Sequence, residues 1–475
     1  MEAITIPHVR IPSINIGGIC LPGIGAPGSI GKKELIWPAG MKEHIKAWYD
    51  PKKQGMTNFD VIEAYVEDFT KFIKNGNGTF AQNKYTSAIT KQEWLLYKTN
   101  GKEIEAMDVY VTSDSTDKST TLRYYYYTNE DNNRKVFYLK AGLNHLPASC
   151  YKEKGSTIGF VFEAAPASEF NITITQLPTS ILKDLSGNGN HAYLYGGKGK
   201  LNSGMGVYGI DVTENIIQQN RFEYLYDNIT KEVTFIKALS TGTYLFTINK
   251  NIVNSTQQIK FEGIDSSIRF INSTTNETYY NITEDGIYDI EFVTDANTII
   301  STNYTTNQEL NLKVQFLPYY PDQLCYDGKM YAVCYGFPIL TDYTVMADRT
   351  WFEKEEYSAF ISNSLGGMEE HNNGAFSVEL KSLNSFTTIS FGSITSIGIP
   401  EKGVTYQTKQ SYNGNSINVG TKESNDILIL GGRYFYKNGN VAGNTWTGCH
   451  GTIIIADRSF TEEEINWLKQ NWDKI

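Results

Sequence analysis

A short run rich in glycine and asparagine constrains this chain more than any other segment. Residues 182–192 read LKDLSGNGNHA, and the central SGNGN gathers residues that tolerate positive φ or bond to their own backbone. Such a run cannot continue a helix or a strand. It therefore predicts a tight turn between two elements of regular structure.

The segments that follow indicate strands and one short terminal helix. Residues 343–347 (YTVMA) are β-prone, and their alternate side chains would share one face of a sheet. Near the C-terminus, Thr461 and Glu464 have the spacing of a capping box. Ile465, Leu468 and Trp472 recur at helical spacing, so a short amphipathic helix should follow that cap.

Four separated segments together resemble one known kind of sandwich. They are residues 46–50 (KAWYD), the turn segment 182–192, residues 324–333 (LCYDGKMYAV) and residues 451–465 (GTIIIADRSFTEEEI). In this order they resemble parts of the concanavalin A-like lectin/glucanase sandwiches, of the laminin-G/pentraxin-like type. The resemblance covers less than half of the chain, and unrelated β-protein turns with a terminal helix are the alternative. It implies a jelly-roll sandwich of the type with which phages and surface proteins contact carbohydrate.

The distances between these segments predict a sandwich interrupted by two insertions. We expect an all-β protein with an N-terminal docking arm at 1–40, a split laminin-G-like domain at 41–55, 181–210 and 318–475, and inserted β modules at 56–180 and 211–317. Each insertion closes with an alternating strand and a Leu-Pro pair, which predicts two related small β-sandwiches of the jelly-roll kind. Two β insertions of unknown kinship are the alternative. Apolar residues between Val61 and Phe72 also suggest a helix early in the first insertion.

The first 40 residues look like an extended arm. Apolar residues alternate there with proline, glycine and polar residues, and the prolines exclude a helix. An apolar arm without a core of its own should dock on another surface. We expect it to bind other virion proteins or sister subunits in a homo-oligomer; the simpler alternative is a terminal strand on its own domain.

Composition excludes several classes of partner. The 475-residue chain has a formal net charge of −10, which argues against nucleic-acid binding. No stretch reaches the ~18 apolar residues of a membrane span. The N-terminus lacks the pattern of a secretory signal, so the expected location is a phage particle, which cell lysis releases without export. The five cysteines form no CxxC pair and read as buried free thiols, although Cys325 and Cys334 could lie close together.

No catalytic or metal-binding pattern is evident. The Glu-x-Asp-x-x-Glu strand of the related glucanases is missing, and the six histidines lack the spacing of metal ligands. We therefore expect no catalytic residue, no enzyme, no metal and no cofactor. The resemblance nevertheless allows calcium, which some relatives hold through Asp and Asn side chains in loops.

Glycan binding is the expected activity. Sugar recognition combines an aromatic face with amide or carboxylate groups for the hydroxyls. Loops 371–374, 411–415 and 444–446 offer such groups, and the expected ligand-binding residues are Tyr412, Asn413, Asn415, Asn444 and Trp446. The structural alternatives are a hairpin turn at Asn413 and a core position for Trp446.

The resemblance implies a virion-associated structural protein, a head or tail fibre or decoration protein, of the kind found in phages of gut Bacteroidales. Its lectin-like domain would engage host-surface or mucosal glycans. Two alternatives remain: a purely structural capsid or fibre subunit without a ligand, and a polysaccharide depolymerase.

Overall fold

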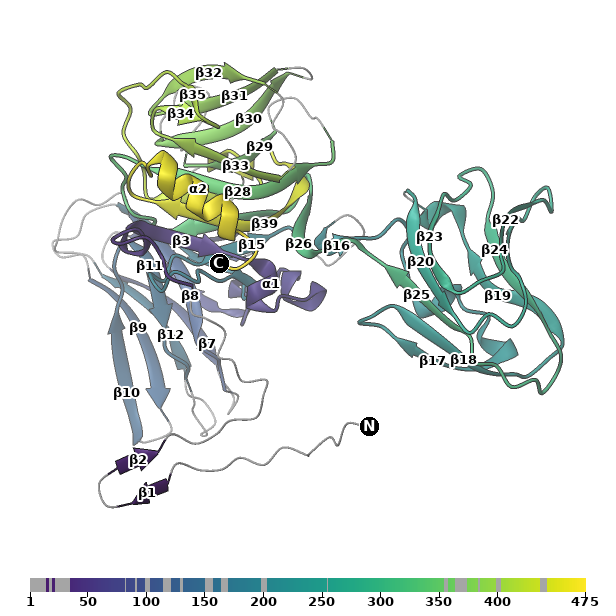
Figure 1. Cartoon of the computed structure of the whole chain (residues 1–475). Helices are drawn as coiled ribbons and strands as arrows, with labels where there is room; N and C mark the ends of the chain where they lie inside the picture. The colour runs from purple at the N-terminus through teal and green to yellow at the C-terminus, as the bar shows by residue number, and fades with distance from the viewer. Residues whose placement is uncertain are drawn as a thin grey trace. The chain divides into compact units, whose positions relative to one another are not determined.

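We describe a computed structural model of the whole chain (Figure 1). The structure describes residues 14–16, 19–21, 35–81, 83–89, 92–98, 103–113, 121–128, 131–149, 157–163, 170–197, 203–253, 255–353, 358–363, 374–382, 385–398, 403–435 and 442–475. The described residues within 1–44 form one compact unit with residues 460–475, and those within 45–459 form the other. Most of the predicted docking arm therefore lies outside the described residues.

The larger unit contains a sandwich of two eight-stranded antiparallel sheets. The first sheet has the order β14 (Ile181–Leu182), β15 (Ala192–Tyr195), β27 (Tyr331–Tyr335), β36 (Ile427–Leu430), β29 (Ala359–Ser362), β30 (Phe376–Ser382), β31 (Ser385–Ser390), β32 (Ser393–Ile397). The second has the order β16 (Gly204–Val207), β26 (Tyr319–Asp327), β39 (Thr447–Ala456), β28 (Thr344–Trp351), β33 (Gly403–Thr408), β34 (Ser411–Tyr412), β35 (Asn415–Ser416), with β3 (Ile45–Tyr49) also pairing with β39. A small hairpin joins β37 (Tyr434–Phe435) to β38 (Ala442–Gly443).

Alternating side chains from both sheets fill the core of this sandwich. In β28, Val345 and Ala347 point inward, as the pattern of residues 343–347 predicted. The same core also contains Met56 and Val61, which follow the short helix α1 (Pro51–Gln54). The packing of the first insertion therefore begins after Val61 rather than at residue 56.

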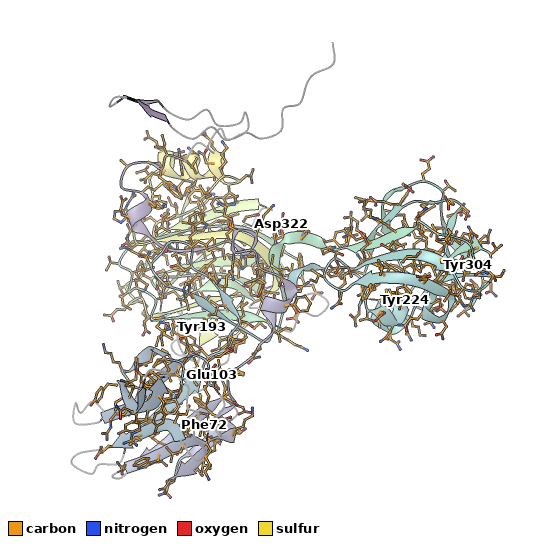
Figure 2. The ribbon with its side chains drawn as sticks, turned by 90° about the horizontal axis from the view of Figure 1, so that it is seen from below. Phe72, Glu103, Tyr193, Tyr224, Tyr304 and Asp322 are labelled. Atoms are coloured by element: carbon orange, nitrogen blue, oxygen red, sulfur yellow. The ribbon has the colours of Figure 1, made fainter. Side chains whose placement is uncertain are left out.

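Residues 73–176 supply two five-stranded sheets of their own. One has the order β10 (Asp131–Tyr138), β9 (Thr121–Thr128), β12 (Thr157–Glu163), β7 (Gln92–Lys98), β4 (Ile73–Asn75). The other has the order β11 (Gly142–Leu146), β8 (Met107–Ser113), β13 (Phe170–Gln176), β6 (Lys84–Ile89), β5 (Thr79–Ala81). Phe72 packs into their shared apolar core (Figure 2). The helix predicted near Val61 is wrong, because two short 3₁₀ turns stand there, η2 (Asn58–Val61) and η3 (Phe69–Lys71).

Residues 222–317 form a second small sandwich. Its five-stranded sheet has the order β17 (Phe222–Asp227), β18 (Glu232–Ala238), β25 (Lys313–Leu317), β20 (Gln257–Glu262), β23 (Gly286–Ile290). The facing sheet has the order β19 (Gly242–Ile248), β24 (Thr298–Tyr304), β21 (Ile268–Asn272), β22 (Thr278–Ile282). Three short 3₁₀ turns accompany these strands: η4 (Glu214–Ile216), η5 (Gln219–Arg221) and η6 (Lys250–Ile252).

The two insertions share one strand order. When the eight consecutive strands β6–β13 and β18–β25 are each numbered from one to eight, both insertions give the orders 1-8-3-6 and 2-7-4-5. The closing strands β13 and β25, which the sequence paired by their Leu-Pro endings, occupy the same place in each sandwich. This is the arrangement of an eight-stranded jelly roll. The all-β fold with two smaller β-sandwiches is thereby confirmed.

The smaller unit contains the C-terminal helix α2 (Glu462–Asn471). Thr461 accepts the Glu464 amide and Glu464 accepts the Thr461 amide, so the predicted capping box is present. The Trp37 ring lies 5.1 Å from the Trp467 ring, which joins the two ends of the chain within this unit. A 3₁₀ turn, η1 (Lys42–His44), and a hairpin of β1 (Ile14–Ile16) with β2 (Ile19–Leu21) also belong to it. Among the described residues, α-helix is confined to α1 and α2.

Candidate functional site

The glycine- and asparagine-rich turn fastens the first strand of the sandwich. The Asp184 carboxylate accepts the backbone N–H of Trp48 at 2.9 Å. The side-chain amides of Asn188 and Asn190 donate to backbone carbonyls of β3 at 2.8 and 2.7 Å. Gly187 and Gly189 have φ values of 90° and 77°, as a tight turn requires. These polar groups of the turn thus form hydrogen bonds to β3 within the protein.

The expected ligand residues fall into two groups. Tyr412 and Trp446 are buried in the sandwich core, and the Trp446 ring lies 5.3 Å from Tyr326. Asn413 has a φ of 46° and its side chain accepts the Tyr406 N–H at 2.9 Å, which makes it a turn residue. A ligand could reach Trp446 only if its side chain left the core.

The asparagines are more accessible. Asn415 is exposed beside the hairpin turn, and Asn444 is half-buried with a φ of 54°. The backbone carbonyl of Asn444 accepts the Ala359 N–H at 3.0 Å. Residues 371–373 of the other expected loop lie outside the described residues.

Sequence reasoning missed a buried arginine between Tyr412 and Trp446. Arg349 is only 3% exposed, and its guanidinium donates to the hydroxyls of Thr405 and Tyr412. Its Cζ also lies 5.1 Å from the centre of the Phe360 ring, which in turn lies 5.0 Å from the Trp446 ring. The structure therefore links two expected residues to one cation, Tyr412 directly and Trp446 through the Phe360 ring.

This cluster is rich in hydrogen-bond donors. The Nε of Arg349 and the indole nitrogens of Trp351 and Trp446 are buried without an acceptor in the part of the chain that the structure describes. Unpaired buried donors are costly, so a water beside them would be stabilised. The sequence held a signal for this cluster: Arg349 follows Val345 and Ala347 at inward-facing positions of one strand.

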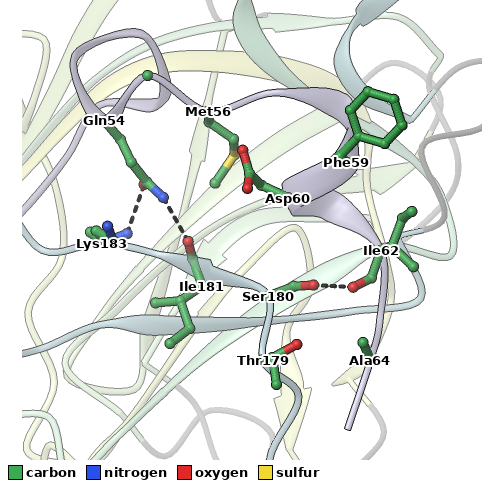
Figure 3. A pocket seen from close by; sticks show the side chains of 11 residues that line it. Gln54, Met56, Phe59, Asp60, Ile62, Ala64, Thr179, Ser180, Ile181 and Lys183 are labelled. Carbon is green, nitrogen blue, oxygen red and sulfur yellow. Dashed lines mark hydrogen bonds between the residues drawn. The ribbon is translucent and has the colours of Figure 1, made fainter. Parts of the chain in front are cut away.

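A second candidate is an open pocket beside α1. It has a volume of about 550 Å³ and lies where the chain leaves the sandwich for the first jelly roll and returns from it (Figure 3). Its lining residues are Gln54, Gly55, Met56, Phe59, Asp60, Ile62, Ala64, Thr179, Ser180, Ile181 and Lys183. Phe59 is 55% exposed, so an aromatic side chain stands free at the pocket.

Hydrogen bonds hold the walls of this pocket in place. Gln54 donates to the carbonyl of Ile181 and accepts the N–H of Lys183, both at 2.8 Å (Figure 3). The Ser180 hydroxyl donates to the Ile62 carbonyl, and the Thr179 N–H donates to the Ala64 carbonyl at 2.7 Å. The two chain segments are therefore tied across the pocket and give it a fixed shape.

Charged groups of both signs complete the pocket. Asp60 uses one carboxylate oxygen to accept from the backbone and hydroxyl of Thr57 at 2.7 and 2.9 Å. Its other oxygen and the Lys183 ammonium have no partner among the residues described. An exposed ring with a free acceptor and a free donor can bind a polyhydroxylated ligand through its apolar face and its hydroxyls.

The structure assigns no metal ligands. Among the described residues, no group of three His, Cys, Asp or Glu side chains lies close enough to hold an ion. We therefore assign no calcium ligands among the described residues, although the resemblance allowed this ion. In the same described part of the chain, no helix has the length and apolar character needed to cross a membrane.

Comparison with known proteins gives no relative of useful similarity. No protein-family model matches the chain, and no curated protein matches it. Among solved structures, Trypanosoma rangeli sialidase in complex with sialic acid has a TM-score of 0.25 and 10% identity, over 85% of this chain and 84% of the sialidase. The PBSX exported protein XepA has a TM-score of 0.17 and 11% identity, over 60% of this chain and 99% of XepA. Procruciferin, an 11S globulin from Brassica napus, has a TM-score of 0.14 and 7% identity, over 53% of this chain and 84% of the globulin.

These comparisons correct one expectation. The chain was expected not to be an enzyme, yet sialidases stand among the structures similar to it. We therefore withdraw that expectation. We assign no activity in its place, because a TM-score of 0.25 supports none.

Proposed function

We propose that this chain is a structural protein of a phage virion, in a head or tail fibre or decoration, and that its split sandwich binds glycans. The sandwich would be of the concanavalin A-like, laminin-G-like type. The placement of the motif segments supports that assignment: β3 and β26 both pair with β39, and the turn at 184–190 fastens β3. Three of the four segments thus contribute a strand to the second sheet, and the turn segment contacts one of these strands, β3.

The pocket beside α1 carries the proposal of glycan binding. Phe59 offers an exposed ring, on which the apolar face of a sugar can stack. The free oxygen of Asp60 can accept from a sugar hydroxyl, and Lys183 can donate to one. Because hydrogen bonds tie the walls together, little ordering should be needed when a ligand binds.

An open pocket with one aromatic ring buries little area. The affinity per site should therefore be micromolar to millimolar, with Kd of about 10⁻⁶–10⁻³ M. A particle that displays many copies would raise the overall affinity through avidity. A weak site is thus sufficient for a virion protein.

A glycan array probed with multimers of the full chain tests the pocket. Wild type should be retained on a subset of glycans, and Phe59→Ala or Lys183→Ala should reduce retention at least tenfold. Tyr138→Ala is the matched control, because Tyr138 is 65% exposed and does not line the pocket. Asn415→Ala tests the expected hairpin surface in the same assay.

Each outcome separates one candidate from the others. Equal retention of wild type and Phe59→Ala removes the pocket, and loss with Asn415→Ala alone moves the site to the hairpin. No retention on any glycan favours a purely structural subunit. Release of shortened saccharides from capsule would identify a depolymerase.

The virion assignment has its own test. Antibody labelling of purified particles in the electron microscope should place the protein on a head or tail fibre. Deleting residues 1–40 should leave a folded protein that no longer oligomerises or enters particles, as a docking arm predicts. A chain that fails to fold without these residues would make them part of a domain.

A further inference from the structure

Two cysteines face each other across the second sheet of the sandwich. Cys325 on β26 and Cys449 on β39 are direct partners in an antiparallel ladder. Directly opposed residues point to the same face of a sheet. Their neighbours Leu324 and Tyr326 belong to the inner core, so the two thiols share the outer face. The sequence suggested Cys334 as the neighbour of Cys325, but the ladder pairs Cys325 with Cys449.

This placement suits a covalent bond. Opposed residues of antiparallel strands have Cα atoms about 4.5 or 5.5 Å apart. Disulfides span Cα separations of about 4.4–6.8 Å, so either kind of ladder position can hold one. The Cys325 and Cys449 thiols already interact directly. The ladder position therefore lies within the Cα range that a disulfide spans.

A small bulge of the chain covers the pair. The ladder between β16 and β26 shifts register where residues 320–323 bulge out, and Tyr320 has a φ of 53°. The Cys449 Sγ lies 2.8 Å from the side-chain oxygen of Gln323 in this bulge. Both thiols are fully buried, and burial followed by the neighbouring thiol raises the pKa of Cys325. The resting Cys325 thiol is therefore protonated, and exchange at the buried pair must wait for local opening.

We propose that Cys325 and Cys449 are a modification site, where a small-molecule disulfide such as oxidised glutathione converts the dithiol to a cross-strand disulfide. One cysteine loses its proton, attacks the reagent and releases one reduced thiol. The second cysteine then loses its proton and displaces the other half of the reagent. Two protein thiols and one disulfide reagent thus become one protein disulfide and two reduced small thiols.

The bond would tie the closing strand of the sandwich to the strand that receives the chain from the second jelly roll. It would close the loop between residues 325 and 449, which constrains the unfolded chain. We therefore expect a higher melting temperature in the oxidised protein. A particle outside the cell, where disulfides persist, would gain most from this bond.

The test uses the full chain, incubated with oxidised glutathione a few degrees below its melting midpoint. After denaturation and alkylation without reductant, mass spectrometry should count three free thiols instead of five, with one peptide pair joined through Cys325 and Cys449. Cys334→Ala should still lose two thiols, whereas Cys449→Ala should form no protein disulfide, because its Cys325 has no second thiol to displace glutathione from the mixed disulfide. Dithiothreitol should restore the thiols and the original melting temperature.

Several results would overturn the proposal. Five thiols that persist after incubation and after refolding with the oxidant show that the pair does not join. A disulfide through Cys334, Cys20 or Cys150 assigns the chemistry elsewhere. If Cys325–Cys449 forms but the melting temperature stays constant or falls, the bond does not act as a staple.

Discussion

The two jelly rolls have the same strand order, yet they relate differently to the sandwich that they interrupt. The first shares a buried seam with the first sheet of the sandwich. That seam consists of Tyr193, Tyr195, Val333, Tyr335, Ile427 and Ile429 from the sandwich, Leu177 from the return segment, and the partly buried Tyr110, Leu143, Ile181 and Tyr331. The second has an apolar cluster that runs from Tyr208 to Phe316 and includes no residue of the sandwich strands.

Tyrosines dominate the seam of the first jelly roll. The rings of Tyr110 and Tyr335 lie 4.6 Å apart, and the Tyr193 hydroxyl donates to Asp108. An exposed hydrogen bond, from the Tyr319 hydroxyl to the Asp289 carboxylate at 2.7 Å, joins the sandwich strand β26 to the second jelly roll. Strand order therefore does not decide whether an insertion is coupled to its host. The side chains on the outer faces decide it.

Deleting each insertion should show the largest difference. Removal of residues 211–317 with a short linker should leave a sandwich that melts cooperatively near the wild-type temperature. Removal of residues 66–176 would expose the seam, and each large apolar side chain returned to water loses about 1.5–3 kcal/mol. That protein should melt far lower or aggregate. Calorimetry measures the melting temperatures, and size-exclusion chromatography detects aggregation. Equal melting temperatures for the two deletion proteins would show that the two jelly rolls are coupled to the sandwich to the same extent.

A single seam residue should behave differently from a core residue of the second jelly roll. Tyr335→Ala removes a buried ring between Tyr110 and Tyr193 and should cost about 3–5 kcal/mol. Phe235→Ala should cost a similar amount inside the second jelly roll. In hydrogen-exchange experiments, Tyr335→Ala should reduce protection in both the sandwich and the first jelly roll. Phe235→Ala should reduce protection only in residues 211–317. If Tyr335→Ala reduces protection only in the sandwich, the sandwich and the first jelly roll are not coupled through this residue.

Acid should lower the stability of the sandwich more than that of the second jelly roll. Burial lowers the pKa of His450 to about 4, and its ring contacts the Tyr326 hydroxyl at 3.0 Å. The unfolded chain binds a proton at this histidine below pH ~6.5, whereas the folded sandwich binds it only below about 4. Stability that is present above pH ~6.5 is therefore lost as pH falls to 4, by about 3 kcal/mol.

The second jelly roll gives an internal control for that pH dependence, because residues 211–317 contain no histidine. Melting between pH 7 and 4 should lower the sandwich transition and, through the seam, that of the first jelly roll. The His450→Gln chain should lose most of this slope. A parallel fall in the second jelly roll would assign the effect to general acid denaturation.

Much of the fold could be predicted, because local patterns and contacts agree. The turn at 184–190, the capping box at Thr461 and the closing strands β13 and β25 follow from turn chemistry and alternation. The helix predicted near Val61 failed because its apolar residues serve two separate cores. Val61 packs into the sandwich, whereas Phe69 and Phe72 pack into the first jelly roll.

The candidate site was less accessible to sequence reasoning. Trp446 resembled a loop residue but fills the core, because β39 begins at Thr447 directly after it. The pocket joins residues 54–64 to residues 179–183, and only the fold brings these segments together. The opposition of Cys325 and Cys449 depends on a pairing across more than 100 positions, which no local pattern encodes.

We expect the smallest difference in stability from two tyrosine hydroxyls, one in the seam of the first jelly roll and one at the link to the second. Tyr193→Phe removes a buried donor to the Asp108 carboxylate, which His145 also contacts at 2.6 Å, and should cost about 1.5–3 kcal/mol. Tyr319→Phe removes the exposed bond to Asp289 and should cost about 0.5 kcal/mol, because water replaces it. Burial and then the Asp108 charge raise the pKa of Tyr193, so the folded chain keeps this proton above pH ~10 while the unfolded chain releases it. Wild type should therefore lose stability as pH rises above ~10, and Tyr193→Phe should lose less over that range. Urea unfolding at pH 8 and pH 11 measures both effects, and equal costs for the two substitutions at pH 8 would show that the seam is no better shielded from water than the link to the second jelly roll.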